Sequence, residues 1–222
     1  MGRSSRVFSL IERAMPGAAT CGRMLVVSPP RRLLKGFLME TTTKKGRVYV
    51  WRVVTPLFRP LSGISLNYSM RVFDGAGVDV DPLDLPASAE TIRKGVETEH
   101  VDYLRALRTI EDFSRHAFAN VKAEPGAELP EVWLPTWIDF ALTQFLLGNE
   151  GPAIGSLRRL DRKVDRMDDA HRLRMSPTIK TLLRTYDENP LDVVPLLDRW
   201  EAENIDRLRL QKAASAIGDD VG

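Results

Sequence analysis

The chain has few of the residues on which catalytic, metal-binding and membrane proteins depend. Its 222 residues include one cysteine, Cys21, and three histidines. A single cysteine excludes a disulfide within the chain and a metal cluster held by several thiolates. No apolar run approaches the ~20 residues that span a bilayer, and residues 24–27 form one of the longest. We therefore expect a cytoplasmic globular protein that does not insert into a membrane.

The sequence signatures of common enzyme classes are absent too. The chain contains no glycine-rich phosphate-binding loop, no dinucleotide fingerprint after a strand and no nucleophile elbow. Glu97 and His100 place a carboxylate and an imidazole one helical turn apart, but carboxylate-bridged di-iron bundles need a second such pair and two further glutamates. The sequence therefore favours a non-enzymatic protein without cofactor or metal. An enzyme built around His100 or His116 is the less favoured alternative.

Charge is distributed very unevenly along the chain. Residues 1–73 hold 13 Lys/Arg and two Asp/Glu, a balance of +11, whereas residues 74–222 hold 19 and 28, a balance of −9. The formal net charge of +2 hides this asymmetry. A basic first part indicates an acidic partner, which is a nucleic acid, another protein or the second part of the same chain.

The first 23 residues contain arginines with little acidic charge to oppose them. This composition is typical of a mitochondrial presequence, which makes the mitochondrial matrix a minor alternative location. We favour an amphipathic first helix with Val7, Leu10, Ile11 and Ala14 on one face. Pro16 and Gly17 then end the helix.

Three strand-like segments follow, at residues 31–42, 47–58 and 63–73. The first two are rich in β-branched or large apolar residues, and Gly46 supplies the positive φ of a tight turn between them. The third alternates with a period of two, which predicts a strand with one buried face. Residues 25–27 add a short fourth strand. We expect an α+β fold, with an N-terminal helix, an antiparallel sheet of three or four strands and a C-terminal helical layer.

Residues 74–87 are rich in Gly, Asp and Pro and predict a linker. Its aspartates lack the ligand spacing of an EF-hand, so we expect a solvated turn. The linker separates residues 1–87, the basic helix and sheet, from residues 88–222, an acidic helical region that packs on the sheet as one unit. Ser88 is the expected N-cap of a long helical stretch. Residues 133–148 and 152–166 indicate an αα-hairpin.

The basic residues of the first part are the candidate binding residues, because several are expected on one sheet face beside Tyr49 or Trp51. Basic side chains next to exposed aromatics bind a phosphate backbone and stack on bases. They serve an acidic protein surface equally well. They also suit the acidic helices of the same chain, so three readings stay open and a protein partner leads. The candidates are Arg31, Arg32, Lys35, Lys44, Lys45, Arg47, Arg52 and Arg59.

Residues 33–72 resemble uncharacterised bacterial α+β proteins, domains of unknown function found near toxin-immunity and phage-defence genes. The resemblance rests on the Gly36-Phe37 pair, the aromatic strand 48–54, the Pro56-Leu57 ending and the alternating segment after it. It implies a small bacterial accessory protein that binds something and does not catalyse. The resulting hypothesis is a non-enzymatic binding protein, an immunity-like or defence-complex accessory subunit, with a nucleic-acid-binding module as the alternative.

Overall fold

The structure is a computed structural model that describes residues 3–73, 77–97, 99–118 and 134–216. By its contacts the chain divides into two compact units. The sheet unit contains residues 1–57, 61–107 and 204–222, and the helical unit contains residues 58–60 and 108–203. The expected boundary after residue 87 lies inside the sheet unit, within the helix α2 (Leu85–Glu97).

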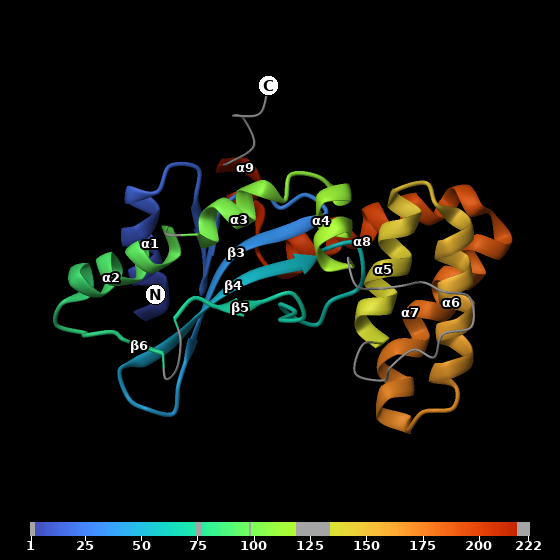
Figure 1. Cartoon of the computed structure of the whole chain (residues 1–222), viewed down its shortest axis with the longest axis horizontal. Coiled ribbons are helices and arrows are strands. Elements are labelled where there is room, and N and C mark those ends of the chain that lie inside the picture. The colour runs from blue at the N-terminus through green and yellow to red at the C-terminus, as the bar shows by residue number, and fades with distance from the viewer. Residues whose placement is uncertain (1–2, 74–76, 98, 119–133, 217–222) are drawn as a thin grey trace. The chain divides into compact units, whose positions relative to one another are not determined.

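The sheet unit contains a six-stranded sheet in which every described pairing is antiparallel (Figure 1). The strands are β1 (Ala19–Cys21), β2 (Met24–Val26), β3 (Leu33–Thr41), β4 (Arg47–Pro56), β5 (Met70–Arg71) and β6 (Val78–Asp79). Their order is β1-β2-β3-β4-β5, and β6 pairs with the start of β4. The N-terminal helix α1 (Arg3–Ala14) precedes the sheet, and further helices follow it. The predicted α+β class is confirmed, although the sheet has more strands than expected.

The β3–β4 hairpin is the longest pairing of the sheet and positions the candidate residues. Its register aligns Leu33 with Pro56 at one end and Thr41 with Val48 at the other. Gly46 has a φ of 80° beside the turn, as the sequence predicts. Gly36 lies where β2 approaches closely, because a Cβ atom there would lie 2.3 Å from the backbone oxygen of Leu25.

Each face of the sheet buries apolar side chains. One face forms a core with the C-terminal segment, where Leu210 and Ala213 pack with Leu34, Leu38 and Val53. On the opposite face Leu25, Phe37 and Met39 are buried. Helix α3 (His100–Ala106) contacts β3, while α1 contacts β1, β2 and α2. The two faces therefore carry different neighbours.

Asn204 connects the C-terminal segment to the end of β4. Its side chain is 1% exposed, and its amide donates to the Leu57 carbonyl oxygen at 2.7 Å. Its own oxygen accepts from the Leu61 amide at 3.3 Å. Both contacts lie within the sheet unit and satisfy backbone groups that burial hides from water.

The predicted strand over residues 63–73 is wrong for most of its length. Only Met70 and Arg71 are in strand conformation, and Leu66 and Met70 are 37% and 42% exposed. Thr55 Oγ1 donates to the Ser65 carbonyl oxygen at 2.8 Å, and the Ser69 amide closes a turn on the Leu66 carbonyl. These bonds hold the segment as a loop, because they occupy backbone groups that a strand needs for pairing.

The predicted N-cap at Ser88 is also wrong, because α2 already begins at Leu85. The Ser88 hydroxyl donates to the Asp84 carbonyl oxygen and accepts from the Asp81 amide, both at 3.0 Å. The expected long helix is divided into α2, α3 and α4 (Ile110–Ala117). Thr109 begins α4 with a capping box that it shares with Asp112.

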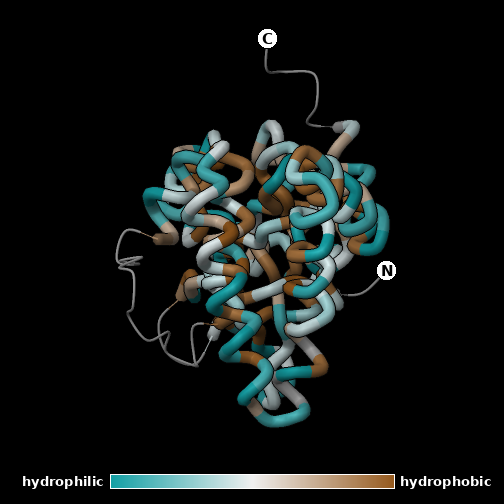
Figure 2. The backbone as a smooth tube through the Cα atoms, turned by 90° about the vertical axis from the view of Figure 1, so that its right-hand side faces the viewer, coloured by the Kyte–Doolittle hydropathy of each residue, from teal (hydrophilic) through white to brown (hydrophobic). Residues whose placement is uncertain are grey.

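The helical unit is built on α5 (Leu134–Leu146), α6 (Glu150–Val164) and α7 (Asp169–Glu188). Helices α5 and α6 pack together and form the predicted αα-hairpin, with Gly148 at a φ of 74° between them. Figure 2 shows hydrophilic and hydrophobic residues alternating along the helices of this unit. Edge-to-face contacts link Phe113, Phe118, Phe140 and Trp137 in its core.

The last helical elements are the 3-10 turn η2 (Pro190–Asp192), α8 (Val193–Arg207) and α9 (Gln211–Ala216). Residues of α8 up to Glu203 count with the helical unit, and those from Asn204 onward count with the sheet unit. Among the described residues, no helix is both long enough and apolar enough to cross a membrane.

Candidate binding surface on the sheet

Tyr49, Trp51 and Arg71 form a cluster on one face of the sheet, which we call the aromatic–arginine surface. Tyr49 and Trp51 are two residues apart on β4 and so point to the same face. Their rings meet edge to face with centroids 6.5 Å apart. Arg71 on β5 pairs with Trp51, and its guanidinium lies 4.1 Å from the Tyr49 ring centroid and 5.0 Å from that of Trp51. The cluster is a cation–π arrangement contributed by two strands.

A carboxylate on β3 fixes the indole of this cluster. The Trp51 N–H donates to Glu40 Oε2 at 2.8 Å, and Glu40 lies directly across from Tyr49. Trp51 also packs against the apolar core on that face, so one side of its ring is anchored. Tyr49 and Trp51 are half-buried and Arg71 is exposed. The surface is thus rigidly placed and still accessible to a partner.

The opposite face of β4 carries a second arginine–aromatic contact. Arg52 lies 3.5 Å from the ring centroid of Tyr103 on α3, and its Nη1 lies 3.4 Å from Nδ1 of His100. Arg52 Nη2 donates to Met70 Sδ at 3.8 Å. His100 is 4% exposed, so this contact belongs to the packing of α3 on the sheet.

Burial and charge shift the proton affinities of these three groups. Burial lowers the pKa of His100 from 6.5, and the positive charge of Arg52 lowers it further. Burial also lowers the pKa of the Arg52 guanidinium. The pKa of Tyr103 is raised by burial of its hydroxyl. At neutral pH the cluster therefore holds a neutral imidazole and a neutral phenol beside one guanidinium.

Lys35 belongs to this buried face as well. It pairs with Val54 in the hairpin register and is 8% exposed. Its Nζ donates to the carbonyl oxygen of Leu107, the residue that follows α3, at 2.6 Å. Lys35 and Arg52 thus hold the two ends of α3 on the sheet, and the structure places neither of them on the aromatic–arginine surface.

The exposed candidates lie at opposite ends of the hairpin. Lys44 and Lys45 occupy its turn and are exposed. Arg31 is exposed and Arg32 half-buried, at the other end, before β3. Eight steps of about 3.3 Å separate the ends of β3, a distance of roughly 26 Å. The structure therefore brings Lys44 and Lys45 together but leaves Arg31 and Arg32 distant from them.

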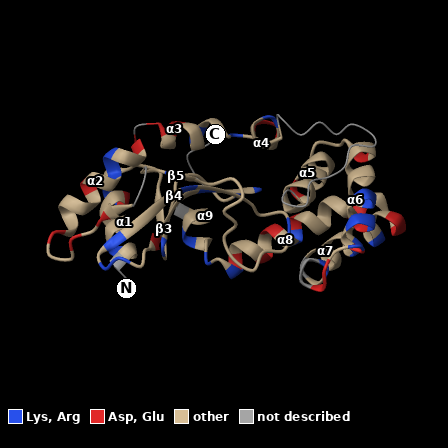
Figure 3. Cartoon of the chain, turned by 60° about the horizontal axis from the view of Figure 1, so that its bottom comes forward, with Lys and Arg blue, Asp and Glu red and all other residues tan. Residues whose placement is uncertain are grey.

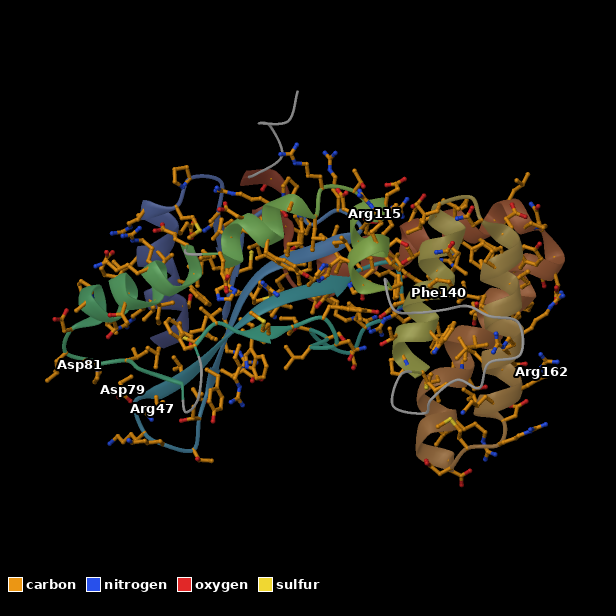
Figure 4. All side chains as sticks on the ribbon, in the orientation of Figure 1. Arg47, Asp79, Asp81, Arg115, Phe140 and Arg162 are labelled. Carbon is orange, nitrogen blue, oxygen red and sulfur yellow. The ribbon has the colours of Figure 1, made fainter. Side chains whose placement is uncertain are left out.

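Arg47 and Arg59 each have an acidic partner within their own unit. Arg47 donates to both carboxylate oxygens of Asp79 on β6, at 2.8 and 2.9 Å, and Figure 4 shows the two labelled side chains together. Hydrogen bonding to Arg47 lowers the pKa of Asp79. Arg59 Nε lies 2.5 Å from Oδ1 of Asp139, which is fully buried in the helical unit. Both arginines therefore have structural contacts.

The charge asymmetry of the sequence is much weaker in the folded units. The sheet unit contains 18 Lys/Arg and 13 Asp/Glu, and the helical unit contains 14 and 17. The difference arises because the acidic residues 74–107 join the basic strands in one unit. Figure 3 accordingly shows basic and acidic residues interspersed on the helices. Internal neutralisation takes up part of the basic charge of residues 1–73, as the Arg47–Asp79 pair at 2.8 Å illustrates.

The remaining chemistry-bearing residues have local roles. His116 is exposed at the end of α4. Burial raises the pKa of the half-buried Cys21 thiol, which keeps it protonated and weakly nucleophilic. Asp81 and Asp84 accept from the amides of Leu83 and Ala87, as turn residues do. In the described part of the chain, no group of three or more His, Cys, Asp and Glu could hold a metal ion.

Sequence reasoning missed the contacts that organise both faces. The pairing of Glu40 with Tyr49 could have been predicted from the sequence. If the hairpin turn is centred between Lys44 and Lys45, residues at equal distances from it on the two strands lie opposite each other, as Glu40 and Tyr49 do. The Arg52–His100 contact had none, since α3 lies about fifty residues further along the chain. No family model, curated protein or solved structure matches the chain.

Proposed function

We propose that this chain is a non-enzymatic binding protein that binds an acidic protein through the aromatic–arginine surface. The observation that supports the proposal is the guanidinium of Arg71 over the rings of Tyr49 and Trp51 on an accessible sheet face. Tryptophan, tyrosine and arginine are the residues that most often dominate the binding energy of protein interfaces. Their combination in a preorganised cluster favours protein recognition.

Lys44 and Lys45 supply the preference for an acidic partner. Both are exposed in the hairpin turn, and Lys45 lies two residues before β4, the strand that carries Tyr49 and Trp51. Charged residues at the rim of an interface accelerate association and reject partners of like charge. We expect the aromatic–arginine surface to provide affinity and these two lysines to provide the association rate.

The same geometry is less suitable for nucleic acid. Single-stranded nucleic acids bind to aromatic platforms by stacking bases on open ring faces. Here Arg71 covers faces of Tyr49 and Trp51, and the indole edge of Trp51 is bonded to Glu40. A base could stack only after displacing Arg71, which favours a protein partner and leaves nucleic acid as an outcome of the test.

The test is an affinity capture from the cells that produce the protein, with and without nuclease, comparing wild type with Trp51→Ala. We expect a protein that survives nuclease and is lost with Trp51→Ala. Nucleic acid that disappears on digestion would replace the proposal with the alternative. A partner captured equally by both forms would contradict the assigned surface. The immunity-like role and the cytoplasmic location stay predictions that the identity of the partner tests.

A further inference from the structure

We propose that His100 is a pH-sensitive switch that controls the position of Arg71 and therefore the aromatic–arginine surface. The switch itself does not depend on the proposed function, whereas its effect on the binding of a partner rests on that function. Its structural basis is the short strand β5 and Val72, the residue that follows it. Met70 contacts Arg52 and the Val72 backbone bonds to the His100 ring, whereas Arg71 contacts the aromatic rings.

Alternation along the chain links the two faces. Met70 and Arg71 are consecutive in β5, so the Met70 side chain points to the face opposite to that of Arg71, and Val72 follows directly. Met70 Sδ accepts from Arg52, and the backbone of Val72 bonds to the His100 ring. Arg71 lies between them and reaches Tyr49 and Trp51. The contacts of Met70 with Arg52 and of Val72 with His100 therefore also fix the position of Arg71 between them.

The hydrogen bonds require a neutral imidazole in one tautomer. An arginine only donates, so Nδ1 of His100, 3.4 Å from Arg52 Nη1, is the acceptor of this contact. The ring proton is then on Nε2 and is donated to the backbone of Val72. Protonation of Nδ1 converts the acceptor into a donor. It also places an imidazolium beside a guanidinium that is itself half-buried.

The surroundings of His100 oppose this protonation. Burial and the charge of Arg52 from β4 lower its pKa, while Glu99 beside it and the bond to Val72 counteract them only in part. From α3 itself, Tyr103 lies against Arg52 as a phenol whose pKa is raised. From β3, Lys35 bonds to Leu107 beyond the other end of α3 and is not among the charges that act on the ring. No carboxylate other than Glu99 acts on the ring among these groups, so the contact is stable only while His100 is neutral.

The sign of the effect follows from linkage. In a locally opened state the imidazole regains its ordinary pKa of 6.5, whereas in the closed state its pKa is lower. The opened state then binds more protons as the pH falls below 6.5, and opening becomes more favourable. Opening rises up to about tenfold per pH unit between 6.5 and the closed-state pKa, then levels off. We expect β5 to loosen and Arg71 to leave the rings under these conditions.

Hydrogen exchange of the Val72 amide, followed by NMR between pH 7.5 and 5, tests the switch in the free protein. This amide donates to the Val50 carbonyl oxygen at 2.9 Å and so reports directly on the pairing beside β5. After correction for intrinsic exchange, its protection should fall below pH 6.5 and then level off at the midpoint given by the His100 ring protons. In His100→Asn, which keeps an acceptor for Arg52 but does not titrate, protection should be independent of pH.

His116→Asn is the matched control and should behave as wild type, because His116 is exposed. The proposal is overturned if wild-type protection stays constant while His100 titrates, or if His100→Asn retains the fall. If His100→Asn does not fold, Arg52→Met should raise the His100 pKa towards 6.5, and an unchanged midpoint would contradict the proposal. None of these readouts needs a partner, so a failed capture at every pH would contradict the proposed function alone.

Discussion

The guanidinium of Arg71 lies 4.1 Å from the ring centroid of Tyr49, its neighbour from the adjacent strand. On the other face of the same sheet, Arg52 lies 3.5 Å from the ring centroid of Tyr103. Arg52 and Tyr103 are both half-buried, and their contact fixes α3, whereas Arg71 is exposed beside a half-buried Tyr49. The two contacts are chemically similar, but the contact of Arg52 with Tyr103 packs a helix on the sheet, whereas that of Arg71 with Tyr49 is accessible to a partner.

Replacing Arg71 by Ala should affect binding far more than folding. An exposed cation–π contact contributes about 0.5–1 kcal/mol, so the free energy of unfolding should fall by no more than that. At the centre of an interface, removal of a dominant arginine lowers the binding free energy by at least about 2 kcal/mol. Urea unfolding and calorimetric titration with the captured partner measure the two quantities. Arg23→Ala, at an exposed arginine of the β1–β2 turn, is the control and should leave both unchanged.

Reversing Lys44 and Lys45 to Glu should slow association with the partner and leave the dissociation rate nearly unchanged. The physical reason is that rim charges act through long-range attraction, which salt screens over about 10 Å at 0.1 M. Stopped-flow association at low and high salt measures the effect, which should shrink as salt rises. Arg47 must be kept, because its two bonds to Asp79 hold β6 on β4. An association rate that does not respond to the double reversal contradicts the role given to these lysines.

The pattern of hydrophobic residues in the sequence predicted those helices and strands that bury one face or both faces in the core. The β3–β4 hairpin follows it closely, because periodicity and a glycine turn determine it locally. Helix α1 forms as predicted, but its predicted face is partly wrong, because Ala14 is exposed and Phe8 is fully buried. The segment 63–73 shows the limit of the method. Its period of two is as regular as that of a strand, but Thr55 and the Ser69–Leu66 turn hold it as a loop. Competition of this kind depends on individual hydrogen bonds of side chains and turns, which the alternation of apolar and polar residues does not encode.

Removing one partner of the buried pair Arg59–Asp139 should destabilise the helical unit severely. Asp139 is fully buried, and an uncompensated buried charge costs about 3–5 kcal/mol. We expect a loss of this size for Arg59→Ala in urea unfolding monitored by tryptophan fluorescence. Arg158→Ala breaks the exposed contact with Asp187 and should change the stability by less than about 1 kcal/mol. A loss as small for Arg59→Ala would show that the pair is not a buried ion pair.

Two glycines should respond to alanine in opposite directions. A Cβ at Gly36 would lie 2.3 Å from the Leu25 backbone oxygen, so Gly36→Ala forces β2 away from β3 and should cost about 1–3 kcal/mol. Gly155 in α6 has open space around it, and Gly155→Ala should stabilise by about 0.5–1 kcal/mol. Thermal unfolding of both variants measures the difference. Equal effects of the same sign contradict the close approach of β2 and β3.

The candidate site was predictable only in its composition. Basic residues next to Tyr49 and Trp51 were expected on a sheet, and Lys44 and Lys45 do lie exposed in its turn. Lys35 and Arg52 have the same charge in the sequence but are used to dock α3, because the hairpin register turns both toward the buried face. The charge of a residue in the sequence does not tell whether its side chain is exposed to a partner or is a buried hydrogen-bond donor within the fold. Only the tertiary contacts of each side chain separate the two.

Site-specific photo-crosslinking from residue 45 tests the central claim most directly. A photoreactive phenylalanine analogue replaces the exposed Lys45, and a second form carries it at the exposed position 184 on α7 as the control. After irradiation in the producing cells, we predict a protein adduct from position 45 that resists nuclease, disappears with Arg71→Ala and does not form from position 184. A nuclease-sensitive adduct, or equal adducts from both positions, would contradict the claim that this surface of the sheet binds a protein.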